Sequence, residues 1–296
     1  MKFGALCNLA SGTIEAIKHT NRMERELPLF FRLSGHFRPD DIWVGDALYG
    51  AYVAIGHSVV MGVDAVARLE GSRKPHLMKD HPLGPNEWLV TWTKPNAKPG
   101  YLNQRQWEAI PGTLKLRMVR VTLNRPGFKP LKFYVVTTLL DRRAYPGKWI
   151  GEMYLRRWRL EVGLRDLKTT MKMEMLRTKT PRMIYKEFLM FIIAHNMIRC
   201  LITQAAAEHN QPVLSISFKG AIDVVCLYAN VLMCARSAKT RKKLFPEMIG
   251  AIADQKVPFR PNRIEPRAVK RRPKTYPPLM ATRKQYRSQF RKQFLK

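Results

Sequence analysis

Four side chains that bind metals or phosphates recur at helical spacing in one stretch of the sequence: Tyr154, Arg157, Glu161 and Lys168. At 100° per residue they fall at about 0°, 300°, 340° and 320° around a helix, within an arc of about 60°. The stripe is about 21 Å long, at a rise of about 1.5 Å per residue. It offers one carboxylate, a possible metal ligand, flanked by groups that bind phosphates. A salt-bridged surface helix explains the spacing equally well, because Arg157 and Glu161 lie four residues apart.

The charge of the chain favours a polyanionic partner. Its 296 residues include 53 Lys and Arg against 22 Asp and Glu, a formal net charge of +31. Such an excess repels itself in a folded protein, and binding to nucleic acid compensates it through the release of condensed counterions. We therefore expect a nucleic-acid-binding protein, with a merely basic soluble protein as the alternative.

Cysteines and apolar runs indicate a soluble protein of a reducing compartment, which we expect to be the cytoplasm. The four cysteines show neither metal-ligand spacing nor a disulfide framework. Two apolar stretches, 188–198 and 213–235, fall short of the roughly 20 uncharged residues that a membrane span requires. No signal peptide opens the chain, so we expect no contact with a membrane.

The first 140 residues indicate an α/β fold. A β-hairpin is predicted over 3–19, a short helix over 21–34, and a strand, a helix and a strand over 42–45, 49–61 and 63–69. Residues 70–140 are rich in turn residues and contain strand patterns at 88–93, 115–123 and 133–140, so this region reads as a β-rich insertion.

From Pro146 onward the pattern is helical and then basic. Helices are predicted over 147–175, 182–208, 215–235 and 241–255, the last broken by Pro246. Residues 258–296 carry 13 Lys and Arg, six prolines and a single acid, Glu265. Such a segment buries too little apolar surface to fold alone, and we interpret it as an arm that becomes ordered on DNA. A solvated tail without function is the alternative.

Four ordered blocks of the sequence resemble the insertion-sequence-4 family of bacterial DDE transposases. The stripe has the family's signature spacing, Y-x2-R-x3-E-x6-K. Residues 45–68 resemble the block around the second catalytic aspartate, residues 6–12 resemble the hairpin before it, and residues 262–274 resemble a basic block after the catalytic domain. The resemblance spans roughly residues 1–280.

This resemblance implies an RNase H-like mixed sheet flanked by helices, a β-rich insertion and a basic, helical C-terminal region. It implies that Asp46 and Glu161 are catalytic and hold Mg²⁺, or alternatively Mn²⁺, two ions occupying an intact site. The reaction would be phosphodiester cleavage at the ends of a mobile element and strand transfer into target DNA, by a homodimer in a synaptic complex. The groups expected to contact double-stranded DNA are Tyr154, Arg157, Arg165, Lys168, Arg267, Lys270, Arg271 and Arg272.

The family's first catalytic aspartate, on a central strand before the hairpin, has no counterpart here. Asp40 and Asp41 are no substitutes, because about 3.3 Å per residue places them some 16–20 Å back from Asp46 along the same strand. We therefore expect the chain alone to be inactive and poorly stable, either as a decayed gene or as the product of a frame whose upstream partner supplies the N-terminus. The expected division is core 1–69, insertion 70–140, core with the glutamate helix 141–208, C-terminal helices 209–257 and basic arm 258–296.

Two other functions fit parts of the sequence. A non-catalytic DNA binder, such as an inhibitor of full-length transposase, would use the basic residues without Asp46. An RNA-binding protein rests on charge alone and lacks a recognisable RNA module. Among the remaining candidates, His195 is interpreted as a core histidine, and Trp149 and Trp158 are expected to pack the glutamate helix against the sheet.

Overall fold

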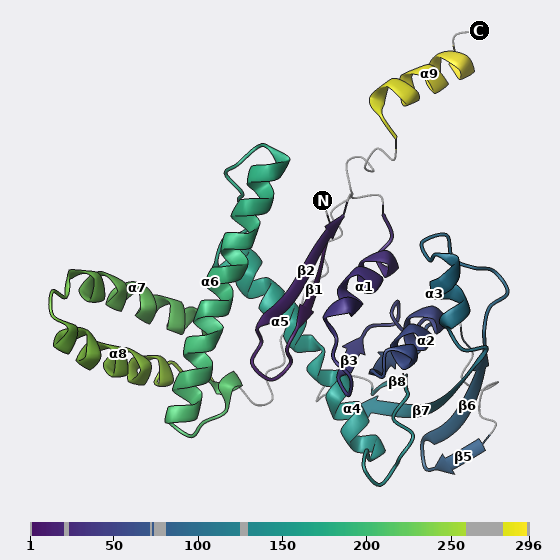
Figure 1. Cartoon of the computed structure of the whole chain (residues 1–296), viewed down its shortest axis with the longest axis horizontal. Helices are drawn as coiled ribbons and strands as arrows, with labels where there is room; N and C mark the ends of the chain where they lie inside the picture. Colours follow the sequence, from purple (N-terminus) through teal and green to yellow (C-terminus); the bar gives the residue numbers. More distant parts are fainter. Residues whose placement is uncertain are drawn as a thin grey trace.

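Two separate β-sheets organise the chain in a computed structural model, which describes residues 2–20, 24–71, 73, 81–124, 130–258 and 281–294. The smaller sheet pairs two strands and the larger has the order β3-β4-β8-β7-β6-β5 (Figure 1). Only β3 and β4 run parallel, and every other neighbouring pair is antiparallel. The strands are β1 Lys2–Cys7, β2 Ile14–Thr20, β3 Ile42–Gly45, β4 Asp64–Arg68, β5 His81–Gly84, β6 Glu87–Thr93, β7 Thr113–Leu123 and β8 Leu131–Thr137.

Helices cover the larger sheet and extend away from it. The N-terminal ones are short, and the three between residues 181 and 253, which include the longest helix, form a separate group (Figure 1). Their bounds are α1 Leu27–Leu33, α2 Tyr52–Val60, α3 Gln104–Ala109, α4 Gly147–Arg156, α5 Trp158–Arg165, α6 Pro181–Glu208, α7 Phe218–Cys234, α8 Ala238–Ala253 and α9 Arg283–Phe294.

The predicted β-hairpin at the start of the chain is confirmed. Asn8 shapes its turn, because its side-chain Oδ1 accepts hydrogen bonds from the backbone N–H groups of Ala10 and Ser11 at 2.9 and 3.2 Å. Gly12 completes the turn with a φ of +78°, a left-handed conformation that favours glycine.

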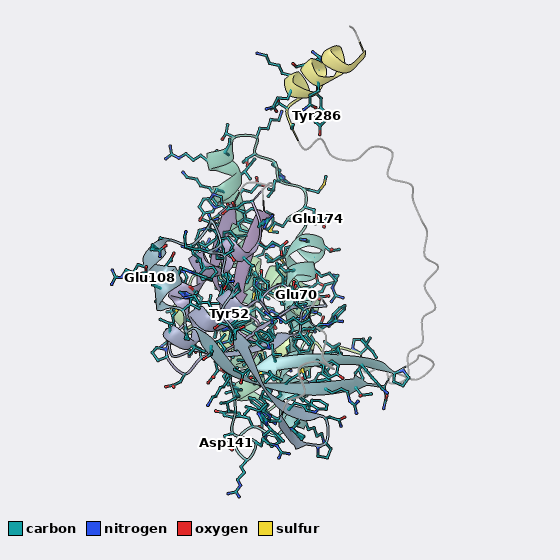
Figure 2. The ribbon with its side chains drawn as sticks, turned by 90° about the vertical axis from the view of Figure 1, so that its right-hand side faces the viewer. Tyr52, Glu70, Glu108, Asp141, Glu174 and Tyr286 are labelled. Atoms are coloured by element: carbon teal, nitrogen blue, oxygen red, sulfur yellow. The ribbon has the colours of Figure 1, made fainter. Side chains whose placement is uncertain are left out.

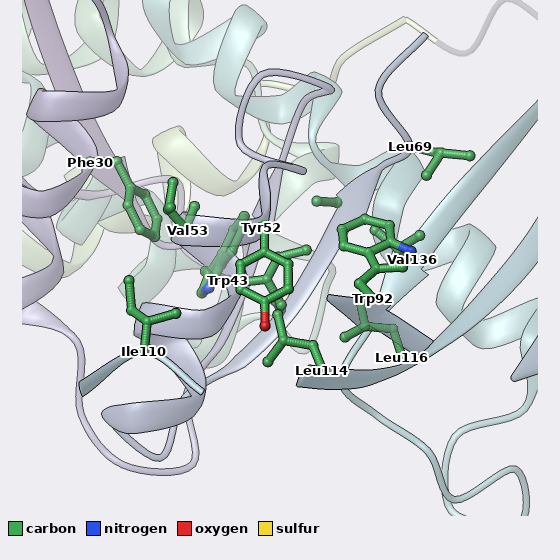
Figure 3. Close-up of a cluster of buried hydrophobic side chains, with 14 of the residues drawn as sticks. Phe30, Trp43, Tyr52, Val53, Leu69, Trp92, Ile110, Leu114, Leu116 and Val136 are labelled. Atoms are coloured by element: carbon green, nitrogen blue, oxygen red, sulfur yellow. The ribbon is translucent and has the colours of Figure 1, made fainter. Parts of the chain in front are cut away.

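The predicted strand, helix and strand after it are confirmed as the parallel unit β3–α2–β4. Side chains alternate along β3: Trp43 packs into the core under α2, while Ile42 and Val44 pack on the opposite face, beside α4. Trp43 donates a 2.7 Å hydrogen bond to the hydroxyl of Ser58, which ties the strand to the helix. Figure 3 shows the core around Trp43 and Tyr52, closed by residues of β6, β7 and β8.

The strands predicted between residues 70 and 140 exist and belong to the same sheet as β3 and β4. Strand β8 pairs with β4, and β7, β6 and β5 follow outward. Arg117 of β7 is fully buried, and its guanidinium contacts Glu87 at 2.7 Å and the carbonyl of Tyr145 at 2.6 Å. This contact fixes the loop before α4, where the exposed Asp141 accepts hydrogen bonds from the backbone of Arg143 and Ala144 (Figure 2).

Three predictions about the helices differ from the structure. The helix expected over 147–175 is two helices that meet at Arg157, and it ends in a π-helical turn, η3 Asp166–Thr170. Pro246 does not break α8, because the carbonyl it leaves unpaired, that of Lys242, lies in an exposed turn open to water. Residues 283–294, in the segment expected to be irregular, form α9, whose start is capped by reciprocal hydrogen bonds between Thr282 and Gln285.

Candidate active site

The candidate active site centres on three side chains of the α4–α5 stretch that the structure brings together. Tyr154 is 6% exposed and packs on Phe133 of β8, with ring centroids 5.3 Å apart. The guanidinium of Arg157 lies 5.9 Å from the Tyr154 ring. Its Nη1 contacts Oε1 of Glu161 at 2.9 Å, so the tyrosine, the arginine and the glutamate form one connected row.

This row holds a permanent positive charge next to a reachable carboxylate. Partial burial acts to lower the pKa of Arg157, but its hydrogen bonds with Glu161 and Tyr154 outweigh burial and raise the pKa overall. The Glu161 side chain is 41% exposed, so one carboxylate can contact both Arg157 and a solvent-borne ligand. The i,i+4 ion pair that the sequence left as an alternative is therefore present, at the edge of the fold.

Asp46 follows β3 directly, at the carboxyl end of the strand. It is exposed, and its Oδ1 accepts a 3.0 Å hydrogen bond from the N–H of Leu48. Helix α4 packs on β3, and alternation gives Asp46 the same side as Ile42 and Val44, which face α4. The strand end thus lies beside α4, the helix that precedes the one carrying Glu161.

The other residues predicted to contact DNA lie either outside the row or outside the described residues. Arg165 and Lys168 are both exposed. Lys168 lies in the π-helical turn, where the Met171 N–H bonds the Asp166 carbonyl at 2.9 Å, and this wider turn moves Lys168 off the ideal helical stripe. Arg267, Lys270, Arg271 and Arg272 lie outside the described residues.

A cavity of about 440 Å³ opens beside the row, between the two sheets. Strand β1 and the Asn8–Leu9 turn line one wall, and residues 41–44 line the facing wall. Within the described part of the chain β1 pairs only with β2, and β3 only with β4, so both facing strand edges are unpaired. Three arginines of the α4–α5 stretch also line the cavity: Arg156, Arg157 and Arg159.

Behind α5 lies a buried ionic cluster that sequence reasoning missed. Asp166 and Arg199 form a 2.8 Å ion pair with both side chains only 8% exposed. Burial raises the pKa of Asp166, and Arg199 and Arg165 oppose that rise. The only sequence signal was an acid in η3 and a cation in the apolar α6, on helices whose contact no local pattern predicts.

His195 is a core histidine, as expected. It is fully buried, and burial followed by the charge of Arg199 lowers its pKa to about 4. Its Nδ1 lies 3.4 Å from the side-chain oxygen of Asn196. That oxygen accepts a 2.9 Å hydrogen bond from the backbone N–H of Ile14, and the amide nitrogen of Asn196 donates a 2.8 Å hydrogen bond to the Ile14 carbonyl. Asn196 thereby ties α6 to the hairpin.

The expectation for the two tryptophans is half right. Trp149 packs with the core of α4 and the sheet, whereas Trp158 is 62% exposed. Trp158 is the first residue of α5, directly after the point where the two helices meet. The arginines that sequence reasoning passed over, Arg156 and Arg159, are the ones that share the cavity with Arg157.

The side chains that could bind Mg²⁺ have the right chemistry for this cation, but they are too few for a metal site. Asp46 and Glu161 offer carboxylate oxygens, the ligands that this hard cation prefers. Among the residues that the structure describes, no three His, Cys, Asp or Glu side chains cluster as a metal site would require. The described residues therefore give carboxylates of the right chemistry without a complete ligand set.

Comparison with known proteins gives two matches. Residues 1–197 match the family described as the transposase DDE domain. Over 208 residues, 66% of this chain, the sequence is 29% identical to transposase InsG for insertion sequence element IS4 of Escherichia coli. The match covers 42% of that relative, so the chain spans less than half of its length.

Proposed function

Because this chain belongs to the DDE transposases of the insertion-sequence-4 family, we propose that it acts on the DNA ends of a bacterial insertion sequence. Its reaction would be metal-dependent phosphodiester cleavage at those ends, followed by strand transfer into target DNA. The observation that carries this proposal is the connected row of Tyr154, Arg157 and Glu161 on α4 and α5, of which α4 packs on β3, the strand that Asp46 follows.

Each of these side chains has a role that its surroundings support. Asp46 and Glu161 would hold the cation through carboxylate oxygens that solvent can reach. Arg157 would bind a phosphate next to the scissile bond, since it keeps its charge and has donors beyond the one that bonds Glu161. Tyr154, rigidly packed, orients Arg157. When bound, Mg²⁺ would supply activation of the attacking water or hydroxyl and charge compensation on the leaving oxygen.

The charge distribution supports double-stranded DNA as the partner. The net charge of +31 and the three arginines of the cavity place positive charge around the Glu161 helix. Arg165, Lys168 and the basic arm, with Arg267, Lys270, Arg271 and Arg272, would extend this contact along the duplex. We propose that two copies act together in the bacterial cytoplasm, because two element ends must be joined.

A second candidate function is a DNA-binding chain that does not cleave alone. Among the described residues no three His, Cys, Asp or Glu side chains cluster, and the unpaired edges of β1 and β3 face each other across the cavity that Arg157 lines. We propose that the catalytic site is incomplete in this chain, which would then bind DNA and depend on a further segment for chemistry.

Metal binding and nicking, measured side by side, test the proposal. Mn²⁺ binding, followed by electron paramagnetic resonance, should weaken at least tenfold in Asp46→Asn and in Glu161→Gln. Glu152→Gln, an exposed glutamate of the same stretch, is the matched control and should bind as the original chain does. Unchanged Mn²⁺ binding in both site variants would refute the assignment of the metal ligands.

A supercoiled plasmid with Mg²⁺ then separates the two candidate functions. Nicking that both site variants lose and Glu152→Gln keeps would show a complete site. No nicking, together with duplex binding that Arg157→Gln weakens, would show a binder alone.

A further inference from the structure

The longest helix, α6, is packed on two sides and free on a third. On one side Phe188 stacks on Phe3 of the hairpin at 3.9 Å between ring centroids, and Asn196 bonds Ile14. On another, the C-terminal half of α6 packs against α7 and α8 (Figure 1). By length and composition alone α6 could also cross a membrane, a property that many core helices of soluble proteins share.

The exposed positions inside α6 follow a strict alternation of three and four residues. Beyond the first two residues and before the last one, the exposed side chains are Met183, Lys186, Met190, Ile193, Met197, Cys200, Gln204 and Ala207. An average spacing of 3.5 residues is that of a coiled-coil seam, in which positions a and d face a partner helix. We call these eight residues the α6 seam.

The composition of the α6 seam is wrong for a face that stays in water. One of its eight residues is charged, and four large apolar side chains are widely exposed: Met183 by 45%, Met190 by 63%, Ile193 by 52% and Met197 by 62%. A solvated helix face carries Lys, Glu and Arg at such positions. A contiguous apolar stripe of this kind marks a surface that another element covers.

We propose that the α6 seam binds the α6 seam of a second copy of this chain, antiparallel, about a two-fold axis between Ile193 and Met197. The inference concerns a surface remote from Asp46 and does not rest on the cleavage chemistry proposed above. It specifies which face would join the two copies.

Antiparallel pairing about that axis matches every seam residue to a suitable opposite. In this arrangement the residue numbers of two facing residues always add to the same sum, as for 193 with 197 and 190 with 200. Each a position of one copy therefore faces a d position of the other. Ile193 meets Met197 at the centre, Met190 meets the small Cys200, and Met183 meets the small Ala207. The two polar residues also meet, Lys186 opposite Gln204, whose amide oxygen can accept from the ammonium. The contact runs for about 36 Å along the helix, at about 1.5 Å per residue.

The single charge of the seam selects the antiparallel arrangement. In a parallel, in-register pair the two Lys186 ammonium groups would face each other in an apolar contact, which is unfavourable. In the antiparallel pair they lie on opposite sides of the axis, 18 residues or about 27 Å apart along the helix. That separation exceeds the Debye length of about 8 Å at physiological salt, so the two charges barely interact.

The polar pair also favours a protein partner over lipid. Gln204 and Lys186 lie inside the stripe, where hydrocarbon would leave their polar groups without partners. The strong net charge opposes the approach of two copies at low salt, and it is screened as salt rises. Dimerisation through an apolar seam should therefore strengthen with ionic strength.

The first test is the mass of the full chain in solution, by sedimentation equilibrium at 0.5 M salt. We expect a dimer for the original chain and at least about a 100-fold weaker dimer for Met190→Lys with Met197→Lys, which place four ammonium groups in the contact. Met233→Lys is the matched control: it is the same change at a residue of α7 that is 84% exposed, and it should leave the dimer intact. A monomeric original chain, or equal weakening by the control, would overturn the proposal.

The second test reads the direction of pairing. Met190→Cys creates a thiol that the antiparallel arrangement places opposite Cys200 of the other copy. With Cys7, Cys226 and Cys234 replaced by serine, mild oxidation should give a covalent dimer through residues 190 and 200, identified by peptide mass. Disulfides that join only like positions, 190 to 190 and 200 to 200, would show parallel pairing and overturn the antiparallel seam.

Discussion

Replacing Arg199 by methionine should strongly destabilise this protein, because it leaves a carboxylate buried without its partner. Asp166 and Arg199 are 2.8 Å apart and each side chain is 8% exposed. Removing one member of a buried pair costs about 3–5 kcal/mol, mostly from the uncompensated charge that remains. The guanidinium also lies 4.7 Å from the Phe218 ring, so methionine retains the bulk and loses the cation–π contact.

The chain contains its own control for this magnitude. Lys219 and Asp223 form an ion pair of 2.7 Å, nearly the same length, but their side chains are 71% and 61% exposed. An exposed i,i+4 pair contributes about 0.3–0.5 kcal/mol. Urea unfolding followed by circular dichroism should therefore give a free-energy loss several times larger for Arg199→Met than for Lys219→Met.

The pH dependence of the loss gives an independent check. Burial already raises the pKa of Asp166, and removal of Arg199 removes a charge that lowers it. In Arg199→Met the pKa of Asp166 in the folded state is then above its unfolded value. The protonated acid is tolerated at low pH, and stability is lost as pH rises through the folded pKa. The deficit of the variant should shrink between pH 7 and pH 4.

Two results would refute this reasoning. One is a loss for Arg199→Met no larger than that for Lys219→Met. The other is additivity in the double variant Asp166→Leu with Arg199→Met, because replacement of both partners by apolar groups should restore part of the stability lost in either single variant.

Three further perturbations follow from the geometry. Gly12→Ala should cost about 1–3 kcal/mol, because φ is +78° and the new Cβ would lie 3.2 Å from Nε of Arg199; Gly62→Ala, with φ +68° and open space, should cost less in the same urea titration. Tyr154→Ala should lose about 3–5 kcal/mol of stability, whereas Tyr154→Phe should unfold within about 1 kcal/mol of the original chain. Because the pKa of His195 is lowered to about 4, the original chain should lose up to about 3 kcal/mol of its free energy of unfolding as pH falls from about 6.5 to about 4. The free energy of unfolding of His195→Gln, measured at pH 7 and pH 4.5, should change less between the two pH values.

The local elements of this protein were readable from the sequence because their signals are local. Alternation and turn residues placed the hairpin, β3, β4 and the strands β6 to β8 within a few residues of their bounds. The 3.6-residue period placed α6 and α7 in the same way. The interruptions of the helix expected over 147–175 were not predicted, because no local pattern marks the meeting of α4 and α5 at Arg157 or the π-helical turn at 166–170.

The candidate site likewise combines features that the sequence predicted with features that only the tertiary structure shows. The spacing of Tyr154, Arg157 and Glu161 put them on one helix face, and the Arg157–Glu161 contact follows from that spacing alone. The buried state of Tyr154, the exposure of Trp158 and the packing of α4 on β3, the strand that Asp46 follows, depend on which elements meet in space. A helix period fixes the angle between side chains on one helix and carries no information about what that helix packs against.

By itself the sequence determined the net charge, the helices and strands, and the spacing of the Tyr154, Arg157, Glu161 and Lys168 stripe. The net charge follows from the composition of the whole chain. The secondary structure and the stripe follow from spacings within helical turns and hairpins. Only the tertiary structure decided the pairing of Asp166 with Arg199, the cavity between the edges of β1 and β3, and the exposure of the α6 seam. These features join residues up to about 150 positions apart, such as Arg159 and the carbonyl of Leu9. The physical reason is that burial and pairing are properties of surfaces in contact, and the contacts are chosen by the free energy of the whole fold.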